Sequence, residues 1–327
     1  MKKKFKINNV SLVIAIALLI VMYLFGAAKY NRFGSLSTIL NLFNDNAYLI
    51  VVSVGMTFVL LTGGIDISVA SIVAFTGVFA AFLLEKGWAA APVIALTLFI
   101  GAFVGFLQGY AVHEFKIAPF LITLAGQFLM RGMCAVVSTI SIPITNDFFK
   151  SAALAKISWV TASGSRPKLY YYVFFAIAIV IIAWYILRFT RFGRAVYAVG
   201  SNEQSAQYMG LNVKGVKVGV YAINGFCSAL GGILFSFYTL AGYSLQNMGM
   251  ELDAISSAVI GGTLLTGGVG TVIGSMVGVL IQGIIQTIVT YQNLNTWWTK
   301  VTIAAILCFF IVIQRLIAIR AEKDKAA

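Results

Sequence analysis

Thr-Gly-Gly occurs twice in this chain, each time inside a hydrophobic run, and one copy is followed by a carboxylate. The sequence reads LLTGGIDISVAS at residues 60–71 and LLTGGVGTVIGS at residues 264–275, and Asp66 belongs to the first copy. Glycine pairs in an apolar segment free backbone groups, which lipid leaves without partners unless protein or a water-filled cavity supplies them. Corresponding interruptions in two halves of a chain indicate the substrate path of a transporter. We therefore expect residues 47–85 and 254–290 to form equivalent walls of a translocation path.

The interruptions also have explanations that need no substrate. The glycines could serve only to let helices pack closely. Asp66 could accept the free N–H groups at the start of the next helix. We favour this capping role over a substrate contact, because Asp66 stands at the boundary of a span, where solvent lowers the cost of a charge. If the path interpretation holds, cysteines placed at Asp66 and Thr266 will react with small polar thiol reagents.

Two glutamines extend the set of polar residues. Gln282 and Gln286 lie at helical spacing in the apolar stretch LIQGIIQTI, where each could bond a neighbouring helix or a substrate. The candidates for the translocation path are Thr62, Gly63, Gly64, Asp66, Thr266, Gly267, Gly268, Gln282 and Gln286.

Membrane-spanning helices must position these residues. The 327 residues are 60% hydrophobic and only 10% charged, with a mean hydropathy of +0.95, whereas a soluble domain has about 25% charged residues. The strand alternation of a barrel is missing, so helices must satisfy the backbone in lipid. We predict an all-α polytopic integral membrane protein with about ten transmembrane helices in a single domain over residues 1–327. The apolar stretches fall near 10–27, 47–62, 69–85, 91–112, 117–139, 170–189, 217–241, 254–266, 269–290 and 299–317, and two short ones flank the interruptions.

The basic residues set the orientation. The net charge of +13 is concentrated at span borders, which argues for topology signals and against nucleic-acid binding. Both termini and the connector at about 190–217 are basic, whereas the segment 242–253 has only Glu251 and Asp253 as charged residues. We therefore predict cytoplasmic termini, a cytoplasmic connector and an external 242–253 loop. The segment 140–169, external in this scheme, carries four basic residues and departs from the rule.

The connector contains a short predicted helix. In TRFGRAVYAVGSNEQSAQYMGLNVKGVKV (190–218), Ser201 or Asn202 is a suitable N-cap, Glu203 lies in the first turn and Gly210 is a stop signal. Such a helix on the inner side could dock a partner protein, or it could be an ordinary loop that faces lipid head groups.

The sequence lacks the residues that several other activities require. No G-x-x-x-x-G-K-[ST] motif for phosphate binding occurs, so an ATPase that drives this chain would be a separate polypeptide. His113 is the sole histidine, and no cluster of nucleophile, base and orienting residue stands out. We expect neither an enzyme nor a bound metal or cofactor. An ion-coupled secondary transporter that uses Asp66 as a proton- or sodium-linked group stays open.

Four ordered motifs resemble a known family. GGIDISVAS, KIAPFLITLAGQFLMRG, TRFGRAVYAVGSNEQSAQYMGL and ELDAISSAVIGGTLLTGGVGTVIG are similar to the permease subunits of bacterial ribose-, arabinose-, xylose- and galactose-type sugar ABC importers, and the resemblance covers nearly the whole chain. SIPI (141–144), FSFYTLAGYSLQNMGMELDAI (235–255) and WWTK (297–300) resemble the smaller permease of galactofuranose importers.

The resemblance implies an assembly in the bacterial cytoplasmic (inner) membrane. Its partners would be a second permease subunit, different from this chain or identical to it, an ATP-binding subunit that holds ATP and Mg²⁺, and a periplasmic sugar-binding protein. The substrate would be a monosaccharide, with galactofuranose favoured; another pentose or hexose, or an autoinducer-type sugar, is the alternative. The positions implied at the ATPase interface are Arg191, Gly193, Arg194, Ala206 and Gly210. Aromatic residues that could stack on a sugar, or form an interfacial belt instead, are Tyr238, Tyr243, Trp297 and Trp298.

Overall fold

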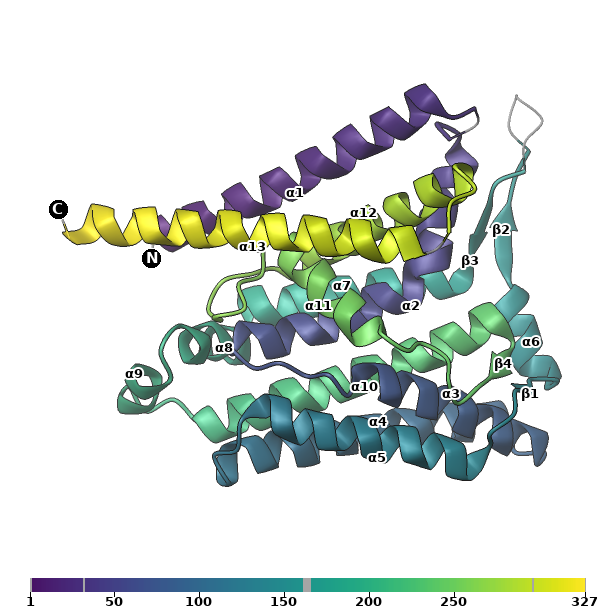
Figure 1. Cartoon of the computed structure of the whole chain (residues 1–327). Coiled ribbons are helices and arrows are strands. Elements are labelled where there is room, and N and C mark those ends of the chain that lie inside the picture. Colours follow the sequence, from purple (N-terminus) through teal and green to yellow (C-terminus); the bar gives the residue numbers. More distant parts are fainter. Residues whose placement is uncertain (1, 32, 161–165, 296, 327) are drawn as a thin grey trace.

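The chain folds into a bundle of helices with two short pairs of strands (Figure 1). The computed structural model describes residues 2–31, 33–160, 166–295 and 297–326. In this part of the chain, seven helices are long and apolar enough to cross a membrane, and two shorter apolar helices join them. The prediction of an all-α polytopic membrane protein is confirmed, whereas the number of about ten spans stays a prediction. The seven are α1 (Lys2–Lys29), α2 (Leu36–Leu61), α4 (Ala90–Glu114), α5 (Pro119–Val137), α7 (Tyr171–Phe189), α10 (Val213–Thr239) and α12 (Val272–Tyr291), and the two shorter apolar stretches are α3 (Val69–Glu85) and residues Trp297–Val312 of α13 (Trp297–Ala326).

The helix before the second interruption is too short to cross a bilayer. α11 (Met250–Ile260) has 11 residues, which at 1.5 Å per residue span about 16 Å, roughly half of a hydrocarbon core of about 30 Å. It ends at Gly261, where the chain turns back into α12. The short segment expected near 254–266 therefore enters the bundle without crossing it as a helix.

The helix before the first interruption is long, and the prediction of a short segment at 47–62 is wrong. α2 begins at Leu36, where the Ser35 hydroxyl oxygen accepts the Thr38 N–H at 3.3 Å. The polar run NLFNDN at residues 41–46 ends the apolar stretch without ending the helix. These polar residues are tolerated because several of them line open pockets.

Close packing of glycines holds the centre of the bundle together. α10 packs against α2, α3 and α4. On α4, a Cβ at Gly105 would overlap the Tyr221 carbonyl oxygen of α10, and a Cβ at Gly225 of α10 would overlap the Gly101 carbonyl oxygen. Small residues let helix backbones approach in this way in membranes. The core around α2 and α10 is consequently dense.

The bundle has two distinct ends (Figure 1). Helices α8 and α9 lie at the same end as both chain termini, on the left of the view, and we call this the connector end. The strand pairs and α6 lie at the opposite end, which we call the hairpin end. That the connector end faces the cytoplasm stays a prediction. The hairpin end contains β1 (Ile142–Pro143) paired antiparallel with β4 (Ala241–Gly242), β2 (Lys156–Ser158) paired antiparallel with β3 (Lys168–Tyr170), and α6 (Asp147–Leu154).

The connector forms two helices where the sequence predicted one. α9 (Glu203–Tyr208) matches the prediction, because Asn202 is its N-cap and accepts the Ser205 N–H at 2.8 Å, and Gly210 follows it with a φ of +77°. α8 (Arg191–Ser201) was not predicted. It begins where the Thr190 hydroxyl oxygen accepts the Gly193 N–H at 3.1 Å.

Candidate translocation path and coupling element

The two Thr-Gly-Gly interruptions contact each other. The Gly268 N–H donates to the Leu61 carbonyl oxygen at 2.8 Å, so the end of α2 is bonded directly to the second interruption. Gly63 and Gly267 have positive φ values of +77° and +83° and lie against one another. A side chain at either position would be strained by its backbone conformation alone. The structure therefore brings the two glycine pairs together at one point.

Helix α8 closes this contact from the connector end. A Cβ at Gly200 would overlap the Leu61 carbonyl oxygen and would lie 2.7 Å from the Gly268 nitrogen. The Tyr197 hydroxyl donates to the Gly270 carbonyl oxygen at 2.8 Å, and burial raises the pKa of Tyr197 to about 12, which keeps the donor protonated. We call this contact between the interruptions and the end of α8 the break junction. It is formed by Leu61, Gly63, Tyr197, Gly200, Gly267, Gly268 and Gly270.

Asp66 is fully buried, and the expectation that solvent relieves the cost of its charge is wrong for this structure. One carboxylate oxygen accepts the Ser68 N–H at 2.8 Å and the Ser68 hydroxyl at 2.6 Å, and the other accepts the Asn224 Nδ2 at 2.7 Å. The N-cap of α3 is Ser68, so Asp66 holds the turn that leads into the helix and ties it to α10. Gln108 of α4 completes the network by donating to the Ser68 hydroxyl at 3.0 Å.

The other members of the first and second interruptions differ in exposure. Thr62 is half-buried, and its hydroxyl donates to the Val59 carbonyl oxygen at 2.8 Å, as expected of a side chain at a helix end. Gly64 is buried, whereas Thr266 is exposed. Labelling reagents can therefore distinguish the exposed Thr266 from the buried Asp66.

We expect a cysteine at Thr266 to react with a small polar thiol reagent, and a cysteine at Asp66 to be protected. The measurement is labelling in native membranes, in a background with Cys308 replaced by serine because Cys308 is exposed. The buried Cys134 and Cys227 can be kept. Fast labelling at position 66 with none at position 266 would contradict the arrangement of the break junction.

The two glutamines on α12 have different environments. Gln282 is buried, and its Nε2 donates to the Asp253 carbonyl oxygen at 3.1 Å and to the Ser256 hydroxyl at 2.7 Å, both on α11. This is the interhelical bonding that was one of its two interpretations. Gln286 is exposed and lines a pocket at the hairpin end.

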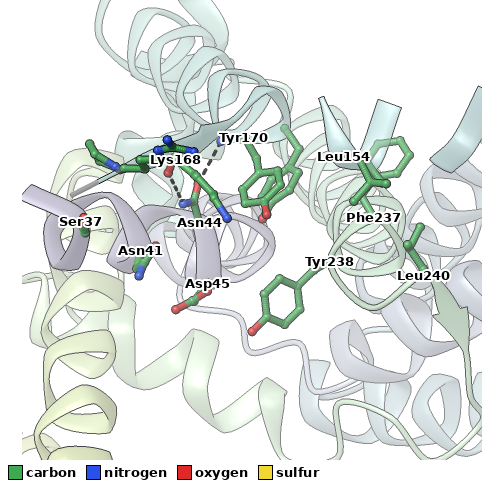
Figure 2. Close-up of a pocket in the computed structure, with 14 residues that line it drawn as sticks. Ser37, Asn41, Asn44, Asp45, Leu154, Lys168, Tyr170, Phe237, Tyr238 and Leu240 are labelled. Atoms are coloured by element: carbon green, nitrogen blue, oxygen red, sulfur yellow. Dashed lines mark hydrogen bonds between the residues drawn. The ribbon is translucent and has the colours of Figure 1, made fainter. Parts of the chain in front are cut away.

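Two pockets with volumes of about 460 and about 320 Å³ open beside the first half of α2, in the range of about 300 to 1,000 Å³ typical of ligand sites. Both are lined by Asn41, Asp45 and Tyr238, and Figure 2 shows the first of them. We call the two pockets together the vestibule. Sequence reasoning missed Asn41 and Asp45, although the polar run at residues 41–46 was a visible signal.

Comparison with known proteins identifies the family. Residues 38–311 match the family described as the branched-chain amino acid transport system / permease component. This chain belongs to that family. It is 41% identical to the inner membrane ABC transporter permease protein YjfF of Escherichia coli K12, covering 98% of this chain and 96% of the relative. The fructose import permease protein FruG of Bifidobacterium longum is 36% identical (97% and 94% covered), and the ribose import permease protein RbsC of Escherichia coli K12 is 31% identical (91% and 92%). No solved structure matches the chain.

These relatives confirm the resemblance to permease subunits of sugar ABC importers that the motifs indicated. The chain is a multi-pass membrane subunit of this permease family. The roles of individual residues in the path and in the connector stay predictions.

The positions predicted at the ATPase interface divide into exposed and buried ones. Arg191, Arg194 and Gly210 are exposed, whereas Gly193 and Ala206 are buried. A Cβ at Gly193 would overlap backbone atoms at the end of α7, so this glycine sets the angle between α7 and α8. Ala206 packs α9 into the core.

Two large side chains are exposed to solvent where α9 ends. Tyr208 is 89% exposed and Met209 is 68% exposed, directly before the turn at Gly210. Lys217 of α10 pairs with Glu203 of α9 at 2.7 Å and helps to hold the short helix in place. The connector therefore contains a short, anchored helix that ends in two exposed large side chains.

Proposed function

We propose that this chain is the permease subunit of an ATP-driven monosaccharide importer in the bacterial cytoplasmic (inner) membrane, and that it forms the translocation path for a sugar delivered by a periplasmic binding protein. The observation that carries the proposal is the similarity over nearly the whole chain to permeases named for fructose and ribose import. ATP and Mg²⁺ would be bound by a separate ATP-binding subunit, since the sequence lacks a phosphate-binding motif.

Coupling to the ATPase would pass through the connector. The exposed side chains that would contact the ATP-binding subunit are Tyr208 at the end of α9, Met209 directly after it, and Arg191 and Arg194 at the start of α8. The C-terminal end of α8 is tightly packed, because Gly200 lies against both interruptions. A displacement of α8 when the ATPase closes would therefore act at once on the end of α2 and on the segment between α11 and α12. Such a shift of packed helices is a common switching device.

Galactofuranose is the sugar that we propose. Its support is the resemblance of SIPI, FSFYTLAGYSLQNMGMELDAI and WWTK to the smaller permease of galactofuranose importers, and this resemblance also favours a second permease subunit that differs from this chain. The binding protein would dock at the hairpin end, near the loop that leads into α11. Asp253 of α11 is already paired with Lys300 at 2.6 Å.

Transport by a reconstituted assembly tests the proposal. Proteoliposomes would contain this chain, its partner permease and its ATPase, with purified binding protein loaded with labelled galactofuranose outside. The expected result is ATP-dependent accumulation that disappears when this chain is omitted. Accumulation of ribose but not galactofuranose would keep the permease role and overturn the sugar. Flux through this chain alone, driven by an ion gradient, would overturn the ABC mechanism in favour of a secondary transporter.

A further inference from the structure

Four polar residues follow one another closely on the first half of α2, and they have two different roles. Asn44 donates to the Lys168 carbonyl oxygen at 2.8 Å and accepts the Tyr170 N–H at 3.2 Å, which fastens β3 to α2. Asn46 donates to the Leu42 carbonyl oxygen within its own helix at 2.9 Å. Asn41 and Asp45 are exposed, and among the residues that the structure describes neither side chain has a hydrogen bond or an ion pair. The first two are structural, and the second two are available to a ligand.

Asn41 and Asp45 are one helical turn apart, so they lie on the same face of α2. That face lines both pockets of the vestibule. Figure 2 shows the Asp45 carboxylate and the Tyr238 hydroxyl extending toward the same opening. Gln286 of α12 lines the second pocket from the other side, and its side-chain amide likewise has no hydrogen bond within the described chain.

An aromatic wall faces these polar groups. Tyr238 is 48% exposed, and its ring lies 6.3 Å from that of Tyr48, which packs edge-on against Phe235 at 4.9 Å. Packing on one side holds the Tyr238 ring, while its other side is free. An aromatic ring with a polar tip offers an apolar face and a hydroxyl to the same ligand, which matches a sugar with its C–H face and its hydroxyl groups.

The charges of the two pockets differ. The first pocket contains Arg166 and Lys168 as well as Asp45. Among the described residues that line the second pocket, Asp45 is the sole ionised side chain, and the other polar groups are neutral amides and hydroxyls. A carboxylate accepts hydrogen bonds strongly and repels an anion, so the second pocket favours an uncharged polyhydroxy ligand over an anionic one.

We propose that Asn41, Asp45, Tyr238 and Gln286 form a binding site for an uncharged monosaccharide in the second pocket of the vestibule. The inference rests on the proposed function and names the residues that first receive the sugar. Asp45 lies 16 residues before Leu61 on one helix, a rise of about 24 Å, so the site is separated from the break junction by most of a membrane thickness. α2 connects the two.

The test uses the reconstituted assembly with ATPase, partner permease and loaded binding protein. We expect Asp45→Ala and Tyr238→Ala each to lower the uptake of labelled galactofuranose about tenfold, the factor that corresponds to losing one charged hydrogen bond or one anchoring ring. ATP hydrolysis stimulated by loaded binding protein should stay unchanged, because α9 and the break junction are not altered. Tyr238→Phe should retain most uptake, since it keeps the ring.

Tyr185→Ala is the matched control, because Tyr185 is an exposed tyrosine on α7 that lines neither pocket. It should transport as the unaltered chain does. Normal uptake by both Asp45→Ala and Tyr238→Ala would overturn the site, and so would a parallel fall in ATP hydrolysis, which would reveal a structural role. If the unaltered assembly takes up neither galactofuranose nor ribose, the proposed function itself fails.

Discussion

Gly200→Ala is expected to lower ATP-dependent sugar uptake at least about tenfold. An extra methyl group in a tightly packed contact costs roughly 1 to 3 kcal/mol, and a cost of about 1.4 kcal/mol reduces the population of the intact break junction tenfold. Alanine is favoured over glycine in a helix by about 1 kcal/mol, so local helix stability predicts the opposite sign. The cost arises because the added Cβ would overlap the Leu61 carbonyl oxygen and approach the Gly268 nitrogen. Both are backbone atoms, which cannot move aside as a flexible side chain can. In the variant, α8 must therefore move away from the two interruptions.

The measurement is uptake by reconstituted assemblies, normalised to the amount of monodisperse protein. Gly132→Ala is the matched control, because Gly132 is also helical and a Cβ there would meet nothing within 4 Å. The control should transport normally. Tyr197→Phe removes the bond to the Gly270 carbonyl oxygen without adding an atom at the contact, and it should give an intermediate loss. Normal uptake by Gly200→Ala would show that the end of α8 is free of both interruptions during transport.

The sequence indicated the two interruptions but not their contact. Repeated Thr-Gly-Gly triplets in apolar runs can be found in the sequence itself. Because lipid leaves their free backbone groups without partners, they indicate segments that are buried in protein or line a cavity. Their meeting point depends on α8, which has no long apolar run and packs through Gly200. A glycine that permits backbone contact leaves no hydrophobic pattern, so the third partner of the junction emerged only from the structure.

The sequence pattern led to two wrong predictions, one at the start of α2 and one just after its end, for related reasons. The polar residues Asn41 to Asn46 looked like the end of a span, yet the helix continues through them because some bond neighbouring backbone and others face a pocket. Asp66 looked like a solvated boundary residue, yet donors from Ser68 and Asn224 let it be buried. The partners of Asn44 on β3 and the Asn224 donor to Asp66 lie more than 100 residues away in sequence, and composition alone carries no information about them.

Asn224→Leu is expected to destabilise the protein by about 2 to 3 kcal/mol, because it leaves a buried carboxylate with one donor fewer. Asn224 is fully buried on α10, and its Nδ2 lies 2.7 Å from the Asp66 Oδ2. Leucine has a similar volume, so the change removes the hydrogen bond without opening a large cavity. Thermal unfolding of the detergent-solubilised assembly should shift downward by about 5 °C.

Thr97→Val is the control for this prediction, since the buried Thr97 hydroxyl bonds only carbonyl oxygens of its own helix, which keep their helical partners. Its effect should be small. The double variant Asp66→Leu with Asn224→Leu should lose less stability than the sum of the losses in the two single variants. Once the Asp66 carboxylate is gone, removing the Asn224 amide no longer leaves a buried charge without its donor. Additive effects would mean that the two side chains do not depend on each other. A coupled pair identifies Asp66 as the fastening of the first interruption to α10, whereas an ion-coupled site would need this carboxylate to exchange its partners during transport.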